Sequence, residues 1–167
     1  MTDFRARRVT QEFTHTISAA PSKVFPLLCP VREYEWIEGW TCKMIYSESG
    51  YAENNCVFTT NFPRGFEEIW SVSAYDPERY IIQFVVTSPE AYIMKLDISL
   101  SESGTNSTNI SWIMTFTGLT PKGNTVIENH TGEPQVTRMG LVFKALEHYC
   151  LTGEMLKKSS LPPALHG

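Results

Sequence analysis

The side chains that could carry chemistry in this sequence are few and widely spaced. The four histidines, His15, His130, His148 and His166, stand far apart and lack the spacing of metal ligands. The sequence also has no glycine-rich phosphate-binding loop, no GxSxG nucleophile turn and no HExxH zinc motif. We therefore expect no metal, no cofactor and no catalytic residue, and we favour binding over enzymatic turnover.

Two polar residues border apolar ones closely enough to be candidates for a ligand site. His15 alternates with Phe13 and Ile17, so the three share one face of a predicted strand. If that face is inward, His15 is a polar contact in an apolar cavity; otherwise it faces outward or is hydrogen-bonded at a sheet edge. Glu147 lies at the edge of an apolar helix stripe, where its carboxyl reaches either a cavity mouth or solvent.

A third candidate, Glu33, lies in the aromatic and acidic segment of residues 31–40. Trp36 and Trp40 follow it, and Gly39 marks a turn. In one interpretation this segment borders a cavity entrance. In the other, the two tryptophans fill the core and the Glu33 carboxylate caps backbone amides.

The elements that must position these residues follow from the hydrophobic periodicity. Alternating apolar and polar side chains predict strands over residues 9–18, 41–48, 55–62, 66–75, 79–87, 91–101 and 109–118. Short turns join most of them, and turns this short join antiparallel neighbours. In the strand 91–101 we expect Met94 to point inward and Lys95 outward, and in the last strand we expect Trp112 and Met114 to point inward.

Helical segments are expected in three places. Pro21 opens a short helix after the first strand, and further prolines keep it short. A second short helix or helical turn is expected within residues 31–40. After a short helical lead-in, the segment from Pro134 to about Gly153 is expected to be one long helix, because apolar residues recur in it at helical spacing. That stripe consists of Val136, Met139, Gly140, Phe143, Leu146 and Cys150.

The order of these elements, with Ala20-Pro21-Ser22-Lys23-Val24-Phe25 after the first strand, resembles the SRPBCC superfamily. That superfamily includes START domains, birch-pollen allergens and polyketide cyclases. The segments EYEWIEGW, CKMIYSESG, LTPKGN and HYCLTG are similar to a bacterial branch of it. The resemblance covers roughly residues 9–155, which we take as the ordered part of a single domain spanning residues 1–167.

The resemblance implies an α+β helix-grip fold. In this fold a curved antiparallel sheet of about six to seven strands wraps around the long C-terminal helix, with two short helices after the first strand. It also implies an apolar cavity of several hundred Å³, a usual size for such sites. The residues expected to line it are Trp36, Trp40, Phe58, Phe84, Met94, Trp112, Met114, Phe116, Met139, Phe143, Glu33, His15 and Glu147.

The expected function is non-catalytic binding of a lipid-like or polyketide-like molecule, as a carrier or a sensor. One alternative is an enzyme of the polyketide cyclase or dehydratase type, which would need at least two polar groups converging in the cavity. Another is a co-chaperone-like interaction protein, which an exposed apolar patch would favour.

Composition and charge limit the partners and the compartment. The net charge of −4 and the absence of a long basic run argue against a nucleic-acid surface. No apolar run approaches the ~20 residues of a membrane span. The four cysteines form no CxxC pair, and no secretion signal is evident, so we expect reduced thiols in the cytoplasm. The partners we expect are an apolar small molecule and, at most, a second copy of the chain in a homodimer.

Overall fold

The computed structural model describes residues 3–61 and 67–162. The strands are β1 (Arg8–Ile17), β2 (Cys42–Tyr46), β3 (Val57–Asn61), β4 (Glu67–Asp76), β5 (Ile81–Ser88), β6 (Tyr92–Glu102) and β7 (Thr108–Gly118). The helices are α1 (Pro21–Val24), α2 (Pro121–His130) and α3 (Glu133–Thr152), with short 3₁₀ turns η1 (Phe25–Leu28), η2 (Glu33–Glu35) and η3 (Lys158–Ser160). Each strand that the alternation predicted is present among the described residues, and the predicted strand ends at residues 62 and 66 lie outside them. The lead-in before the long helix is a full helix, α2.

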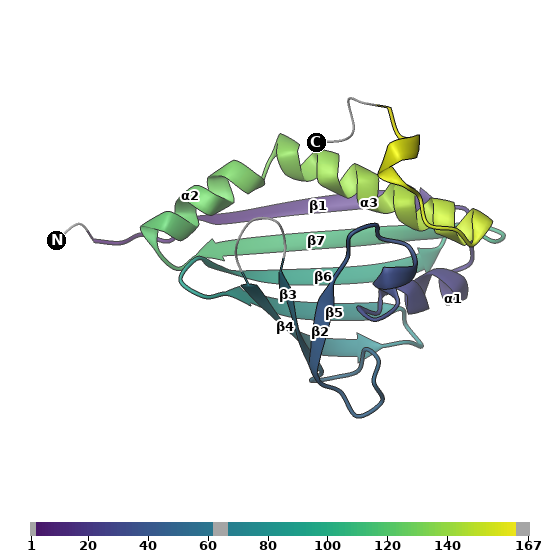
Figure 1. Ribbon diagram of the computed structural model, residues 1–167, viewed down its shortest axis with the longest axis horizontal. Helices are drawn as coiled ribbons and strands as arrows, with labels where there is room; N and C mark the ends of the chain where they lie inside the picture. Colours follow the sequence, from purple (N-terminus) through teal and green to yellow (C-terminus); the bar gives the residue numbers. More distant parts are fainter. Residues whose placement is uncertain (1–2, 62–66, 163–167) are drawn as a thin grey trace.

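The strands form one antiparallel sheet in the order β1-β7-β6-β5-β4-β3-β2 (Figure 1). The first two strands of the sequence therefore lie at opposite edges of the sheet. The pairing register shifts between Met44 and Tyr46 in β2 and between Val72 and Ala74 in β4. Such bulges add local twist, and in Figure 1 the strands β2 to β4 run obliquely to the longer strands β5 to β7. The sheet is therefore strongly curved.

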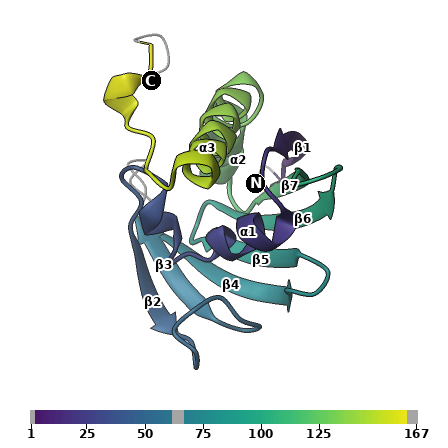
Figure 2. The same ribbon diagram turned by 90° about the vertical axis from the view of Figure 1, so that its right-hand side faces the viewer.

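The long helix α3 lies over the concave face of this sheet, and α1 with the chain that follows it lies across one end (Figure 2). Gly153 ends the helix with a left-handed φ of 73°, a conformation that glycine adopts without strain. The buried residues of α3 are Gln135, Met139, Phe143, Leu146 and Cys150. This arrangement confirms the expected helix-grip architecture.

The apolar stripe expected on α3 is wrong at two positions. Val136 is 47% exposed and Gly140 is also exposed, whereas the polar Gln135 is 5% exposed. Gln135 is tolerated inside because its Nε2 donates to the Sδ of Met114 at 3.1 Å and its Oε1 accepts from Arg138. Buried positions spaced by four residues, from Gln135 through Met139 to Phe143, define the face that contacts the sheet.

The inward and outward faces of the sheet follow the expected alternation. Met94, Trp112 and Met114 are each at most 8% exposed. Lys95 is exposed, and its Nζ lies 3.2 Å from the Oδ1 of Asp97 on the outer face. Strand parity fixes this result, because a shift of one residue would bury the charged side chains.

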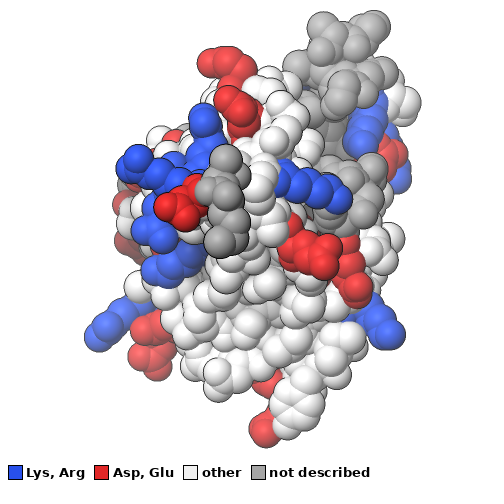
Figure 3. Space-filling view, turned by 90° about the vertical axis from the view of Figure 1, so that its left-hand side faces the viewer, with Lys and Arg blue, Asp and Glu red and all other residues white. Residues whose placement is uncertain are grey.

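The outer surface carries charges of both signs. Figure 3 views the end of the molecule near α2, where lysine and arginine side chains are interspersed with aspartate and glutamate. Within residues 3–61 and 67–162, no helix combines the length and the apolar character needed to cross a membrane. The four cysteines are free thiols, and three of them are buried.

Candidate ligand-binding cavity

A small apolar cavity of about 170 Å³ lies between the concave face of the sheet, the chain after α1, and α3. Its described walls consist of Leu28, Pro30, Glu33, Ile37, Trp40, Phe58, Trp70, Phe84, Leu96, Ile98, Trp112 and Val142. The volume is smaller than the several hundred Å³ expected from the resemblance. The inner side chains of the sheet fill more of the space under α3 than the fold alone suggests.

Three aromatic rings from neighbouring strands form one part of the cavity wall. Phe58 of β3 pairs with Trp70 of β4 in the strand register, and their rings stack with centroids 5.5 Å apart. Phe84 of β5 meets the ring of Trp70 edge to face at 5.6 Å. The three side chains share the inner face because side chains alternate along each strand. The result is a rigid apolar surface suited to flat ligands.

The opposite wall comes from the segment between α1 and β2. Two indole nitrogens hold this segment in place: the Nε1 of Trp36 donates to the Leu27 carbonyl and the Nε1 of Trp40 donates to the Pro30 carbonyl, each at 2.8 Å. Trp36 is completely buried, so it anchors the segment without lining the cavity. These bonds fix the backbone from which Glu33 extends toward the cavity.

Glu33 is the one ionisable side chain among the described residues of the cavity wall. Burial raises the pKa of its carboxyl to about 8. No hydrogen bond or ion pair from this carboxyl to another described residue is present, so the second interpretation of Glu33, an amide cap, is not realised. Glu33 as a whole is only half-buried because it borders the cavity. A raised pKa favours the protonated, uncharged form of this carboxyl.

The neighbouring carboxyl of Glu35 shows the opposite shift. The Arg32 guanidinium, and after it the hydroxyl of Tyr149, hold the pKa of Glu35 below its ordinary value. Arg32 makes two bonds to this carboxylate, at 2.9 and 3.0 Å. The pKa values of two glutamates two residues apart are therefore shifted in opposite directions, because one faces apolar side chains and the other faces an arginine.

The four indole N–H groups divide into three that are satisfied and one that is not. Those of Trp36 and Trp40 donate to carbonyls, and that of Trp70 donates to the Oγ1 of Thr60 at 2.9 Å. The Nε1 of Trp112 is buried and has no partner among the described residues, although Trp112 lines the cavity. A buried donor without an acceptor is unusual and calls for an explanation.

Five of the predicted ligand-site residues border the cavity, namely Glu33, Trp40, Phe58, Phe84 and Trp112. His15 and Glu147 do not. The His15 Nε2 lies 3.3 Å from the Oε2 of Glu147, whose Oε1 accepts from Ser18 at 3.3 Å. His15 also stacks on Phe143, with ring centroids 5.3 Å apart. The structure thus places this pair at the seam between β1 and α3, away from the cavity.

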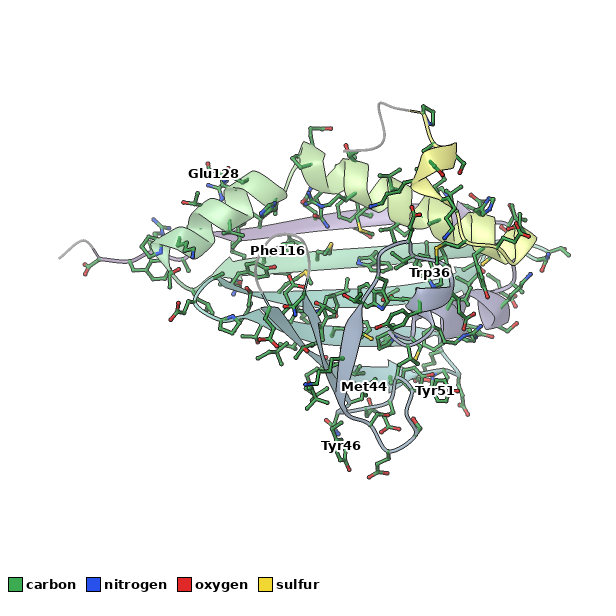
Figure 4. The ribbon with its side chains drawn as sticks, viewed as in Figure 1. Trp36, Met44, Tyr46, Tyr51, Phe116 and Glu128 are labelled. Atoms are coloured by element: carbon green, nitrogen blue, oxygen red, sulfur yellow. The ribbon has the colours of Figure 1, made fainter. Side chains whose placement is uncertain are left out.

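The remaining predicted residues are buried but lie outside the cavity wall. They are Trp36, Met94, Met114, Phe116, Met139 and Phe143. Figure 4 shows Phe116 toward the α2 end of the sheet and Trp36 among the short helical turns. Phe116 packs edge to face on Tyr92 at 5.5 Å, and Met114 contacts Gln135. These contacts fill the space under α2 and the start of α3, so the cavity is confined to the other end.

The sequence predictions missed seven wall residues, which are Leu28, Pro30, Ile37, Trp70, Leu96, Ile98 and Val142. Strand parity could have indicated Trp70, Leu96 and Ile98, because each lies on the inner face of its strand. No local signal distinguishes Val142, which lies beside the buried stripe of α3 and not within it.

A larger hollow of about 550 Å³ lies outside the sheet-and-helix core, between α1 and the C-terminal end of α3. It is lined in part by Lys23, whose Nζ donates to the Cys150 carbonyl at 2.6 Å, and by Arg32, which is paired with Glu35. We prefer the smaller cavity as the site, because its described walls are almost wholly apolar and include one ionisable side chain, that of Glu33. Within the described ranges, no group of three or more potential metal ligands is present.

No protein-family model and no curated protein sequence matches the chain. Solved structures do match its shape. One is a point mutant of norcoclaurine synthase from Thalictrum flavum, in complex with a transition-state analogue. It matches with a TM-score of 0.68 at 12% sequence identity, and the match covers 90% of this chain and 99% of the synthase chain. Ara h 8.0201 matches with a TM-score of 0.63 at 18% sequence identity, and the match covers 87% of this chain and 99% of the Ara h 8.0201 chain.

The chain has the helix-grip fold. An uncharacterised protein from Rhizobium leguminosarum shares it too, with a TM-score of 0.62 at 11% identity over 88% of this chain and 97% of its own. The synthase and Ara h 8 are members of the SRPBCC superfamily, which confirms the resemblance at the level of the fold. Identities this low establish the helix-grip architecture alone, and function must be argued from the cavity.

Proposed function

We propose that the protein binds a small apolar molecule in the cavity between β3–β7 and η2, and that it carries or senses this molecule without transforming it. The observation that carries the proposal is a preformed space of about 170 Å³ in which Glu33 is the one ionisable residue among otherwise apolar and aromatic described walls. Apolar walls with a few placed polar groups are typical of small-molecule sites. Among the structures that share the fold, one of the synthase is a complex with dopamine and hydroxybenzaldehyde.

The distribution of acid–base groups favours binding over turnover. A cyclase or dehydratase needs a positioned acid or base together with a group that stabilises developing charge. Of the three polar candidates, only Glu33 borders the cavity, while His15 and Glu147 bond to each other elsewhere. The cavity thus supplies shape and affinity, and little chemistry.

A second candidate function rests on the raised pKa of Glu33. A carboxyl whose pKa is about 8 holds its proton near neutrality and is suited to act as a general acid. An enzyme of this kind would lose turnover in Glu33→Gln while keeping ligand affinity, because glutamine retains the shape and the hydrogen-bonding capacity of the protonated acid.

The proposal is tested by filling the cavity. Val142 borders the cavity from α3, whereas Val136 is exposed on the same helix. We expect Val142→Phe to fold and to lose binding, and Val136→Phe to fold and to keep it. Binding is read as co-purification of a small molecule in native mass spectrometry, and as a ligand-induced rise of the melting temperature. Binding that survives in folded Val142→Phe, or no binding by the wild-type protein, would refute the proposal.

We further propose a cytoplasmic location. The four cysteines are free in the structure, and the thiols of Cys56 and Cys150 are buried, with pKa values that burial raises. Unreactive buried thiols are compatible with a reducing compartment. Quantification of free thiols in protein released from cells under alkylating conditions tests this location, and disulfide-linked protein would contradict it.

A further inference from the structure

We propose that the cavity binds small amines, molecules in which an apolar body carries one ammonium group, and that the Glu33 carboxylate pairs with that group. This inference rests on the proposed binding function and adds the polar group of the ligand to it. Three features carry it. They are a carboxyl without a described partner, an aromatic wall, and the lack of any cationic side chain among the described wall residues.

The Glu33 carboxyl is enclosed by the protein and yet open to contact. It borders the cavity, and it has no hydrogen bond or ion pair with another described residue. Within the described chain, the fully enclosed polar atoms that lack a hydrogen bond belong to Ser88, Asp97 and Trp112. The oxygens of the half-buried Glu33 are not among them, so they keep surface that a bound molecule can touch.

The charged and titratable groups on the neighbouring elements have other partners. Arg32 of the same segment is paired with Glu35, and Arg138 of α3 is bonded within α2 and α3. Burial, and with it the charge of Glu33, raises the pKa of the Cys42 thiol on β2, which favours the neutral thiol. Burial is also the cause that raises the pKa of Glu33 itself. A cationic partner for this carboxyl must therefore come with the ligand.

The aromatic wall favours a cation over an uncharged polar group. The face of an aromatic ring carries partial negative charge and attracts an ammonium group that lies over it. Rings from four strands and from the segment after α1 border the same space as the Glu33 carboxyl, namely Trp40, Phe58, Trp70, Phe84 and Trp112. Cavities that combine such rings with a carboxylate are suited to amines, because both features attract positive charge.

The desolvation costs also favour an ammonium ligand. Folding has already moved the carboxyl out of water, and this cost is visible in its pKa of about 8. An entering ammonium adds only its own desolvation, which the carboxylate and the rings offset. An anion would find no lysine, arginine or histidine among the described wall residues, and it would pay a large desolvation cost without compensation.

Formation of this pair releases one proton. Below the raised pKa of Glu33, the free amine is an ammonium ion and the free carboxyl holds its own proton. The pair of an ammonium with a carboxylate contains one proton fewer than the two free partners, and that proton passes to the solvent. The affinity for an amine should therefore rise with pH up to about 8 and level off above it.

The test compares benzylamine with benzyl alcohol, which have the same ring and nearly the same size but differ in charge. One ring suits the cavity, because an apolar cavity of roughly 150 Å³ holds benzene and this one measures about 170 Å³. In the wild-type protein we expect the amine-to-alcohol affinity ratio to rise at least about tenfold from about pH 6 to about pH 8. Val142→Phe should lose both probes, since it fills the cavity.

Two variants separate the Glu33 carboxylate from the general charge of the protein. Glu33→Gln keeps the shape of the side chain and cannot become an anion. It should lower the amine-to-alcohol ratio at least about tenfold near pH 8 and make that ratio independent of pH. Glu154→Gln removes the same charge from an exposed position, so it should behave like the wild-type protein.

A second measurement needs only the wild-type protein and covers the case in which Glu33→Gln does not fold. Titration calorimetry in two buffers with different heats of ionisation gives the number of protons released on binding. Near pH 7 we expect close to about one proton for each bound benzylamine and none for benzyl alcohol.

The outcomes separate this inference from the proposed function. An affinity ratio that does not depend on pH or on Glu33, with no proton release, would overturn the inference, and binding of benzyl alcohol would still support the proposed function. Tighter binding of the alcohol at every pH would also overturn it. If neither probe binds, the inference is overturned, and the comparison of Val142→Phe with Val136→Phe decides the proposed function separately.

Discussion

The hydroxyl of Tyr149 on α3 donates a 2.6 Å hydrogen bond to the Oε2 of Glu35 in η2. Arg32 holds the same carboxylate through two further bonds. Glu33, two residues earlier, borders the cavity, and Val142 lies on the same helix as Tyr149. The contact therefore ties the segment that covers the cavity to the helix that closes it from the other side.

Removal of this hydroxyl should loosen the cover of the cavity. We expect Tyr149→Phe to cost about 0.5–1.5 kcal/mol of stability and to speed amide hydrogen exchange in η2, because the segment loses a link to α3. The control is Tyr46→Phe, which removes an exposed hydroxyl that bonds to Glu48, outside the cover segment, and should leave the exchange of the η2 amides unchanged. Unchanged exchange of the η2 amides in Tyr149→Phe would show that the hydrogen bond does not restrain the cover.

The raised pKa of Glu33 predicts a stability that falls with rising pH. Between its ordinary value of 4.5 and the folded value of about 8, the native carboxyl holds a proton that the unfolded chain has released. The free energy of unfolding therefore declines across this window and levels off above it. Across this window the wild-type protein should lose at most about 5 kcal/mol of its free energy of unfolding. The Glu33→Gln variant has no carboxyl to ionise at this position, so it should not show this loss.

Chemical denaturation between about pH 5 and pH 9 measures this effect. Glu154→Gln, at an exposed position, is the matched control and should follow the wild-type pH profile. Parallel profiles for Glu33→Gln and the wild-type protein would mean that the Glu33 carboxyl is solvated and ionised in the folded state.

Truncation of Phe143, on the inner face of α3, should be costly. Its side chain is 4% exposed and lies between the His15 ring at 5.3 Å and the Trp112 ring at 6.1 Å. Phe143→Ala should lower the free energy of unfolding by about 3–5 kcal/mol, because it leaves a void that its neighbours cannot close. A loss below about 1 kcal/mol in chemical denaturation would show that the site collapses or is loosely packed.

Replacement of glycine by alanine should have opposite effects on stability at Gly123 and at Gly140. A Cβ on Gly123 would lie 1.7 Å from the Ala91 carbonyl oxygen, so α2 could not rest against the turn before β6. Gly123→Ala should cost at least about 1–3 kcal/mol through overpacking. Gly140 is exposed within α3 and has open space around it, so Gly140→Ala should stabilise by about 0.5–1 kcal/mol. Melting temperatures of the two variants check the pair, and equal shifts would contradict it.

Hydrophobic periodicity was sufficient to predict the sheet, but it was not sufficient to predict which residues line the cavity. The alternation around Met94 and Lys95 has a single solution, because the other register buries a charge. The predicted stripe of α3 was wrong at Val136 and Gly140, which are exposed. It also omitted Gln135, because a tertiary contact to Met114 outweighs the polarity of the amide. Local pattern does not report such long-range partners.

The position of the cavity depends on packing between distant segments. Phe116 and Phe58 have the same sequence signature, as aromatic residues on inward strand faces, yet only Phe58 borders the cavity. Whether an inner side chain meets a ligand or a neighbour depends on the side chains packed around it, here Tyr92 of the neighbouring strand β6 for Phe116. The raised pKa of Glu33 likewise arises from burial by surrounding residues and not from its immediate sequence.

Among the strands that the structure describes, β1 has a single neighbour, β7, which comes last of the strands in the sequence, and Arg8 pairs with Thr117. During synthesis on the ribosome, β1 emerges first and has no hydrogen-bonding strand until β7 has left the exit tunnel. Contacts this distant in sequence slow folding, and an unpaired strand is a site for association with other nascent chains. Closure of the sheet is therefore a late event, and a chain that stalls before Thr108 exposes β1 as an open edge for a chaperone to cover.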